Sequence, residues 1–439
     1  MIRFQLLFFT IIIIIINSLA HALIESAPSN TKYYEIQIPM NDSRVHNRVG
    51  TLIDEGQILG PDRIFNQTLV KLWATENATR ELQALAGDTM FISPSEHEPE
   101  SRSDLDSNNN DKDSVHQYIR KSRPDFFTEY RRYQEMTQYA QELVSSYPNL
   151  MSLETFGKSF EGRDLILMKI GSRSNGDKPI IWIDAGIHAR EWIASTSAFY
   201  IASQLPVQYH SDPIVKQLMD HFDFYIAPMV NPDGYEYTHT TNRFWRKTRS
   251  NHSKGQCVGV DANRNFGFKW MVEGASNNPC AETYAGPKAF SEPETQAIRD
   301  YLLKFTRDNG SQIRAYLTFH CFSEQWLYPW GYNKDVPPNG KQLEEKAKIA
   351  VDAMGRTKNK YLIGPSGKTL YPAAGGSDDW ALAEAKINYA YTIELSPGFT
   401  SSKNGFVLPP QKIIPVSDEI FKAVKAFSKS LRDDAVRNG

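Results

Sequence analysis

A short apolar run with reactive side chains directly behind it limits how this chain can fold. Residues 179–185 (Pro-Ile-Ile-Trp-Ile-Asp-Ala) are nearly all apolar and predict a strand buried on both faces. Gly186 then allows a turn, and His188, Arg190 and Glu191 follow at once. In open sheets of alternating strands and helices, ligands bind just beyond the carboxyl ends of strands. The segment therefore predicts a binding site at the edge of such a sheet.

Strands and helices alternate in the predicted pattern from Phe126 to the end of the chain. The predicted strands are 164–170, 179–185, 222–228, 314–319 and 389–393, and the predicted helices are 130–145, 195–204, 292–305 and 416–431. Ser291 and Glu294 form a predicted capping box for the helix at 292–305. The alternation predicts an α/β fold with a mixed, mostly parallel twisted sheet and helices on both faces.

Length, composition and charge narrow the class of protein. The chain has 439 residues, of which 41% are hydrophobic, which suits two domains, or one large domain with an appendage, around a sizeable core. The formal net charge of −2 gives no reason to expect a nucleic acid or an anionic membrane as partner. We expect a monomer.

The N-terminus has the pattern of an export signal. A basic start at Arg3, an apolar run over 6–16 and Ala20-His-Ala22 predict a signal peptide at 1–22 and a secreted, extracellular protein. The alternative is an uncleaved anchor, but the run is shorter than the roughly 20 residues that a spanning helix needs. Weak support for secretion comes from sequons, which permit glycosylation at Asn41, Asn66, Asn77, Asn251 and Asn309.

Residues 23–94 are predicted to form a small α+β module. Residues 33–39 alternate in polarity and predict a strand, 67–85 predict an amphipathic helix, and 88–93 predict a second strand. The module precedes the main domain, which we place at 124–439.

The two domains are joined by a polar segment at 95–123. Its composition cannot bury itself and predicts an exposed linker. The linker ends in Arg120, Lys121 and Arg123, a cluster that a trypsin-like protease can cut, because nicking concentrates in such segments. The alternative is a solvated charge run without processing.

Two further predicted strands end in reactive side chains. His320 follows the strand at 314–319, and Glu394 follows the strand at 389–393. A catalytic zinc takes three protein ligands and keeps one position open, so His188, Glu191 and His320 form a candidate ligand set. Glu394 is then a general base for water. Any one histidine alone is more simply structural, but three strand ends together favour a metal site.

Several stretches, in order along the chain, resemble the zinc metallocarboxypeptidases of the pancreatic A/B type, which are made as secreted proenzymes. These stretches are 157–163, 186–192, 231–235, 244–250, 261–266, 371–380 and 392–395. They lie within roughly 125–432, and the module at 23–94 loosely resembles the family's inhibitory prosegment.

The resemblance implies a role for residues around the metal. It assigns zinc binding to His188, Glu191 and His320, and the general base to Glu394. It also implies that Arg246 polarises the scissile carbonyl, a role that suits a fixed cation beside developing negative charge.

The resemblance also implies a substrate site. Asn263 and Arg264 would hold the substrate's terminal carboxylate, which the arginine fork binds with two parallel hydrogen bonds. Tyr371 would close over the substrate, and Arg190 would line a subsite. These residues imply that peptide and protein C-termini are the substrates.

Specificity depends on Asp378, which falls on the family's pocket floor. B-type enzymes, which remove Lys or Arg, carry Asp at that position, whereas A-type enzymes carry an aliphatic residue. A buried carboxylate attracts a cationic side chain and disfavours an apolar one. Ser366 and Gly331 match other pocket positions and are small, which leaves room for a long side chain. The alternative is that Asp378 is only a second polar residue of the loop and does not set the specificity.

The chain departs from the family pattern beside the site. Cys321 and Phe322 stand where the family usually has Ser-Tyr, and Ser396 stands where it commonly has Arg. Cys257 and Cys280 match the family's disulfide, which leaves Cys321 as an expected buried, inert thiol.

The sequence thus predicts a secreted zinc exopeptidase with one Zn²⁺, activated by a trypsin-like protease and inhibited by its own prosegment. It is expected to prefer C-terminal Lys or Arg. The alternatives are an A-like preference for apolar residues, a catalytically silent peptide-binding relative, or a deacylase.

Overall fold

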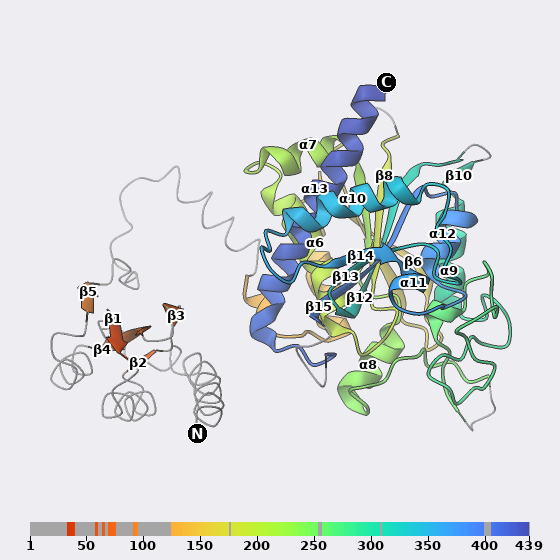
Figure 1. Cartoon of the computed structure of the whole chain (residues 1–439), viewed down its shortest axis with the longest axis horizontal. Coiled ribbons are helices and arrows are strands. Elements are labelled where there is room, and N and C mark those ends of the chain that lie inside the picture. The colour runs from red at the N-terminus through yellow and green to blue at the C-terminus, as the bar shows by residue number, and fades with distance from the viewer. Residues whose placement is uncertain are drawn as a thin grey trace. The chain divides into compact units, whose positions relative to one another are not determined.

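The computed structural model describes residues 33–39, 58–59, 64–65, 69–75, 91–94, 124–174, 177–252, 257–307, 310–398 and 405–438. The chain divides into two compact units, Met1–Asp111 and Lys112–Gly439 (Figure 1). Several sequence predictions lie outside the described residues: the signal peptide at 1–22, the linker with its basic cluster at 95–123, and the sequons at Asn41, Asn66, Asn77 and Asn309. The predicted domain boundaries stay a prediction.

The described part of the N-terminal unit is an antiparallel sheet with the order β2-β4-β1-β5, and β3 pairs with β4. Its strands are β1 (Tyr33–Pro39), β2 (Ile58–Leu59), β3 (Ile64–Phe65), β4 (Leu69–Thr75) and β5 (Phe91–Pro94). The strand predicted at 33–39 is confirmed, and β5 overlaps the strand predicted at 88–93.

The helix predicted at 67–85 is wrong over β4. This segment pairs with β1 along its whole length, from Tyr33 opposite Thr75 to Pro39 opposite Leu69. Leucine spacing suggested a helix, but a partner strand of equal length supplies a ladder of backbone hydrogen bonds that spacing within one segment does not reveal.

The larger unit contains a sheet of eight strands in the order β14-β13-β15-β12-β8-β9-β7-β6. These strands are β6 (Met151–Lys158), β7 (Asp164–Ile170), β8 (Ile180–Ala185), β9 (Asp223–Ala227), β12 (Ile313–Ser323), β13 (Gln325–Tyr328), β14 (Leu362–Pro365) and β15 (Tyr389–Gly398). The central pairs β15-β12, β12-β8 and β8-β9 are parallel, whereas β6-β7, β7-β9 and β13-β15 are antiparallel. The predicted mixed, mostly parallel sheet is confirmed.

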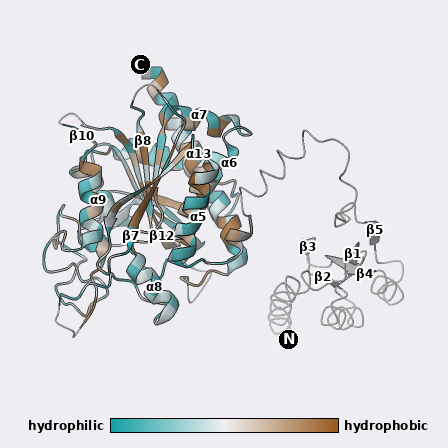
Figure 2. Ribbon diagram, turned by 180° about the vertical axis from the view of Figure 1, so that it is seen from behind, coloured by the Kyte–Doolittle hydropathy of each residue, from teal (hydrophilic) through white to brown (hydrophobic). Residues whose placement is uncertain are grey.

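Helices cover both faces of this sheet, and Figure 2 shows apolar residues concentrated along its central strands. A first hydrophobic core lies between one face of the sheet and five helices. These are α5 (Tyr133–Ser146), α6 (Trp192–Gln208), α7 (Pro213–His221), α10 (Gly340–Ala353) and α13 (Ile413–Asn438). A second core packs the other face against α9 (Pro293–Leu303) and α12 (Ser377–Ala383). In the part of the chain that the structure describes, no helix is long and apolar enough to cross a membrane.

Alternation along the strands explains why both faces are apolar. In β8, Ile181 and Ile183 join the first core, whereas Ile180 and Trp182 join the second. Successive side chains on a strand point to opposite faces, so a strand with apolar residues at nearly every position is buried on both sides. The prediction for this segment is confirmed.

The capping box predicted for Ser291 and Glu294 is wrong. The helix α9 begins at Pro293 with Glu292 as its N-cap, because proline is favoured at the first helical position. The Ser291 hydroxyl donates to Glu292 Oε1, and Glu294 Oε1 accepts instead from the Phe160 amide at 2.9 Å.

Glu294 makes the stability of the larger unit sensitive to pH. Its side chain is almost fully buried, and Oε2 has no hydrogen-bond partner among the described residues. Burial raises the pKa of Glu294 from 4.5 to about 8. The folded chain therefore holds a proton that the unfolded chain releases above pH 4.5, so this group's stabilisation is complete below that pH and is lost as the pH rises to 8.

We expect Glu294→Gln to remove this pH dependence, because an amide does not ionise. Between pH 5 and 8 the free energy of unfolding of the native chain should fall more steeply than that of the variant, by up to about 1.4 kcal/mol per pH unit. Urea unfolding at several pH values measures both slopes. The exposed Glu384 supplies the control Glu384→Gln, and equal slopes for native chain and Glu294→Gln would contradict the assignment.

Candidate active site

A glycine turn places the first cluster of site residues beyond the carboxyl end of β8. Gly186 has a φ of +69°, and a Cβ there would lie 2.3 Å from Ser195 Oγ on α6. Glycine is needed at such a position because it accepts this backbone conformation and leaves the space free. The turn carries His188 into the cleft, and Glu191 becomes the N-cap of α6.

His320 and Glu394 come from the middle of the sheet. They are direct neighbours in the parallel register of β12 and β15. Both strands continue past these residues, to Ser323 and Gly398, so the site residues lie within the strands and not at their ends as predicted. The sheet itself, being hydrogen-bonded on both sides of β12, fixes their backbone positions.

His188, Glu191 and His320 converge as a set of metal ligands. Their donor atoms all lie within 4.8 Å of one another, and all three side chains are buried. His188 Nδ1 lies 2.8 Å from Glu191 Oε1 and 3.1 Å from His320 Nδ1, and His320 Nδ1 lies 3.2 Å from Glu191 Oε2. Ligands about 2.0–2.1 Å from a tetrahedral zinc lie about 3.3 Å apart, so the donor set fits zinc.

Charge in this cluster also suits a cation. Although burial opposes ionisation, the two imidazoles hold the pKa of Glu191 well below its ordinary value. Burial and the neighbouring Arg246 lower the pKa of His188. Despite burial, Glu191 raises the pKa of His320. A metal requires a carboxylate and neutral imidazoles, so a bound cation would take the place of the proton on His320.

Asp261 supports two of the predicted site residues at once. Its Oδ1 lies 3.1 Å from His188 Nε2, and its Oδ2 accepts from Arg246 Nε and Nη2 at 3.0 and 2.9 Å. Despite burial, Arg246 and His188 hold the pKa of Asp261 well below its ordinary value. A carboxylate behind a ligating histidine fixes its orientation. Sequence reasoning assigned no role to Asp261, and its place in the matched stretch 261–266 was the only signal.

Glu394 is partly buried beside these residues. Burial raises its pKa to about 7, with a further increase from Glu191, while His320 and Arg246 lower it. A carboxyl with a pKa near neutrality can both accept and release a proton at physiological pH.

One cleft of about 220 Å³ brings together predicted site residues that lie far apart in the sequence, from His188 to Glu394. The predicted residues that line it are His188, Arg190, Glu191, Arg246, Asn263, Arg264, His320, Tyr371, Asp378 and Glu394. Leu327, Leu370 and Phe406 also line it, and no motif in the sequence pointed to these three.

Asn263 and Arg264 lie side by side in the short 3-10 helix η3 (Ala262–Arg264). Arg264 is 3% exposed and donates Nε to the Gly274 carbonyl and Nη1 to the Asn263 carbonyl, both at 2.9 Å. These backbone acceptors orient the guanidinium without neutralising its charge. Asn263 Oδ1 accepts from the Ser377 amide at 2.9 Å, which ties η3 to α12.

Asp378 lies at the first turn of α12 and is 4% exposed. The Ser366 hydroxyl lies 3.4 Å from Asp378 Oδ2, and burial raises the pKa of Asp378. The neighbouring Asp379 instead accepts from the amides of Gly331 and Tyr332, each at 2.8 Å. Asp379 therefore builds the loop, whereas Asp378 faces the cleft.

Tyr371 and Arg190 both line the cleft. Tyr371 is 58% exposed, which leaves its side chain free to change position. Arg190 donates to the Phe244 carbonyl and to Glu282, each at 3.2 Å, and its guanidinium lies 4.2 Å from the centre of the Phe406 ring.

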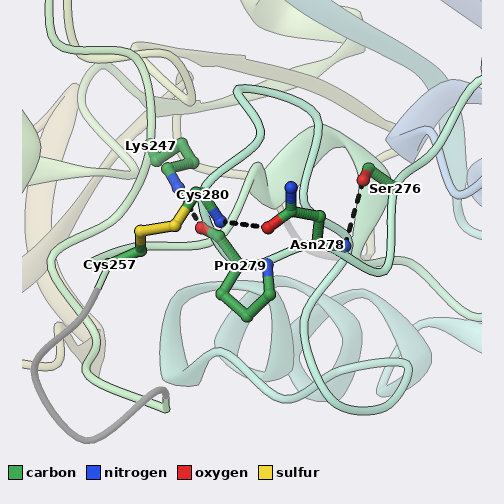
Figure 3. Close-up of a disulfide and its surroundings, with 6 residues drawn as sticks. All are labelled: Lys247, Cys257, Ser276, Asn278, Pro279 and Cys280. Carbon is green, nitrogen blue, oxygen red and sulfur yellow. Dashed lines mark hydrogen bonds between the residues drawn. A yellow bond between two sulfur atoms is a disulfide. The ribbon is translucent and has the colours of Figure 1, made fainter.

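Cys257 and Cys280 form a disulfide (Figure 3). Beside the disulfide, Lys247 donates to the Pro279 carbonyl at 2.8 Å. The disulfide and this hydrogen bond hold the loop that carries Glu282 against the segment 244–250, close to Arg190. Cys321 is a free, buried cysteine of the first core, and burial raises the pKa of its thiol.

Comparison with known proteins agrees with this geometry. Residues 136–423 match the zinc carboxypeptidase family. Carboxypeptidase B of Astacus astacus is 43% identical over 309 residues, which are 70% of this chain and 98% of that protein. Carboxypeptidase A2 of Rattus norvegicus is 38% identical over 308 residues, 70% of this chain and 71% of that protein.

Solved structures share the fold. Bovine thrombin-activatable fibrinolysis inhibitor, solved in complex with tick carboxypeptidase inhibitor, aligns with a TM-score of 0.64 at 35% identity, over 70% of this chain and 99% of that chain. With the ligand set His188, Glu191 and His320, these matches show that the chain belongs to the zinc carboxypeptidase family and is a zinc metallopeptidase.

Proposed function

We propose that this chain is a secreted exopeptidase that removes C-terminal Lys or Arg and is made as a proenzyme. The proposed preference for Lys or Arg rests on the position of Asp378. Its carboxyl group lines the same cleft as the metal ligands and Arg264. A buried carboxylate without a partner cation has a high desolvation cost. The ammonium or guanidinium group of a substrate would pair with it and would bind more strongly there than an apolar side chain.

The substrate's terminal carboxylate would bind Asn263 and Arg264. Both side chains are held by backbone groups, so little conformational entropy is lost when the carboxylate binds. A free carboxylate is the mark of a chain end, which explains exopeptidase action. Tyr371 would then close over the bound residue.

His188, Glu191 and His320 would hold the zinc, which when bound polarises the scissile carbonyl and lowers the pKa of water to about 7. Glu394 would take the proton from the attacking water and pass it to the leaving amine. Arg246, fixed by two hydrogen bonds to Asp261, would donate to the carbonyl oxygen as it becomes negative.

The proposals of export and activation rest on the sequence before the main domain at 124–439. The segment 1–22 has the pattern of a signal peptide, and the basic cluster Arg120, Lys121 and Arg123 offers cleavage sites between the module at 23–94 and the main domain. Cleavage there would release the main domain from a prosegment that inhibits it.

We expect the full chain to become active after limited trypsin treatment. Blocked peptides ending in Lys, Arg, Phe and Leu, assayed with and without a zinc chelator, measure activity and specificity together. Lys and Arg peptides should be cleaved fastest, and the chelator should abolish cleavage. Faster cleavage of Phe or Leu peptides would contradict the basic preference, and no cleavage despite bound zinc would indicate a silent relative.

A further inference from the structure

Each histidine of the ligand set has a second ring nitrogen, Nε2, on the side of the ring away from the other ligands. His188 Nδ1 and His320 Nδ1 lie 3.1 Å apart, and both lie close to Glu191, so Nδ1 is the atom that each ring turns toward the metal position. A neutral imidazole that ligates through Nδ1 carries its hydrogen on Nε2, and a buried N–H group needs an acceptor. His188 Nε2 has the carboxylate of Asp261 at 3.1 Å. His320 needs an acceptor of its own.

Thr318 lies behind the ring of His320. Its Oγ1 is 3.4 Å from His320 Nε2, and the two side chains are 0% and 1% exposed. The residues are two positions apart on β12, so their side chains lie on the same face of the sheet. A hydroxyl can accept from one group and donate its own hydrogen to another. If Thr318 accepts from His320, its hydroxyl hydrogen needs a second acceptor.

Asp184 is placed to be that second acceptor. It is paired in register with Thr318 across the parallel strands β8 and β12, and neighbouring strands lie about 4.8 Å apart. Asp184 is fully buried, and its Oδ2 accepts from Trp182 Nε1 at 2.8 Å, whereas its Oδ1 has no hydrogen-bond partner among the described residues. Burial raises the pKa of Asp184, and nearby donors, Thr318 first among them, oppose this increase.

The end of β8 explains why a hydroxyl lies between His320 and a carboxylate. The pairing of β8 with β12 stops at Ala185, which is opposite Phe319. No residue of β8 is therefore paired with His320, and the carboxylate that β8 does carry, Asp184, lies one row lower on the same face. From that row it reaches His320 only through Thr318.

We propose that Thr318 and Asp184 are positioning residues for zinc, in which His320 Nε2–H donates to Thr318 Oγ1 and the Thr318 hydroxyl donates to Asp184 Oδ1. This relay gives His320 the carboxylate support that Asp261 gives His188 directly. Such support fixes the orientation of a ligating ring and raises its basicity. The relay concerns the zinc site and does not depend on the proposed preference for Lys or Arg.

The test measures zinc binding by the purified full chain, without a substrate. Competition with a colorimetric zinc chelator of known affinity gives the dissociation constant of zinc for the native chain, Thr318→Val and Thr318→Ser. Valine has nearly the shape of threonine but no hydroxyl, so we expect the dissociation constant to rise about 10- to 100-fold. Serine keeps the hydroxyl and should bind zinc within about threefold of the native chain.

Asp184→Asn tests the far end of the relay. An amide offers only one acceptor oxygen, so either Trp182 or Thr318 loses its acceptor, and we expect zinc affinity to fall by a factor similar to that of Thr318→Val. The double variant should lose no more than the weaker-binding single variant, because both changes break the same chain of hydrogen bonds. Losses that multiply in the double variant would show that the two residues act separately and would overturn the relay.

Tyr316→Phe is the matched control. Tyr316 lies two residues before Thr318 on β12, and its hydroxyl is a fully buried group near Asp184 without a hydrogen-bond partner among the described residues. Its removal changes the surroundings of Asp184 but leaves the relay to His320 intact, so zinc affinity should stay within about twofold of native.

Three results would contradict the relay. The first is native zinc affinity in Thr318→Val. The second is a loss of affinity in Thr318→Val that is just as large in Thr318→Ser, because the hydroxyl is then irrelevant. The third is an equal loss in Tyr316→Phe, which would assign the effect to general disturbance of the buried row.

Discussion

Glu394→Gln is expected to lower kcat/KM by about a thousandfold, the range that a positioned general base contributes. The amide has nearly the shape of the carboxylate but cannot accept a proton. Glu394 is paired in register with His320 and has a pKa of about 7, so the native side chain combines the required position with the required basicity. Cleavage of a peptide ending in Lys measures the loss.

The loss of activity can be assigned to Glu394 only if the Glu394→Gln variant folds and binds zinc as the native protein does. Metal analysis of the purified chain should give the same zinc per chain for variant and native protein, because Glu394 is outside the ligand cluster. Glu384→Gln, on the surface, should keep full activity. A Glu394→Gln variant with more than a tenth of native activity would refute the assigned role.

Asp378→Asn is expected to remove the preference for basic residues. We expect kcat/KM for peptides ending in Lys or Arg to fall about 100- to 1,000-fold, because breaking a buried ion pair leaves the substrate's charge uncompensated. Peptides ending in Phe or Leu should be cleaved at least as fast as before, since the pocket loses a charge that disfavours them. The ratio of the two rates is the measurement.

Asp379→Asn is the matched control for this change. Asp379 is adjacent and buried, but both of its oxygens accept from backbone amides. The Asp379→Asn substitution should lower the free energy of unfolding and leave unchanged the ratio of kcat/KM for peptides ending in Lys to that for peptides ending in Leu. If Asp378→Asn keeps its basic preference while Asp379→Asn loses it, the pocket floor has been assigned to the wrong carboxylate.

The main features of the fold could be predicted from local patterns. The strand at 179–185 was recognisable because apolar residues occupy almost every position, which is the pattern of a strand buried on both faces. The helix predicted at 67–85 failed over β4 because its pairing partner, β1, lies elsewhere in the sequence. The capping box at Ser291 failed because Pro293 moved the start of α9 by one residue.

The candidate site shows the same division. His188, Glu191, His320 and Glu394 could be proposed because metal and proton chemistry require those residue types. Short matched stretches carry three of them, and His320 follows a predicted strand. Asp261 and Phe406 could not, since a carboxylate that orients a histidine and a ring that lines a cleft have no sequence signature of their own.

The sequence by itself determined which side chains are available for chemistry and that β8 is buried, because ligand type and apolar periodicity are local properties. The tertiary structure alone showed that His320 and Glu394 are paired within the sheet and that α12 brings Asp378 into the same cleft. That arrangement depends on the register of β12 with β15 and on the packing of α12 across both strands. Such contacts join residues far apart in the chain, and the free energy that selects them comes from burial of the whole core.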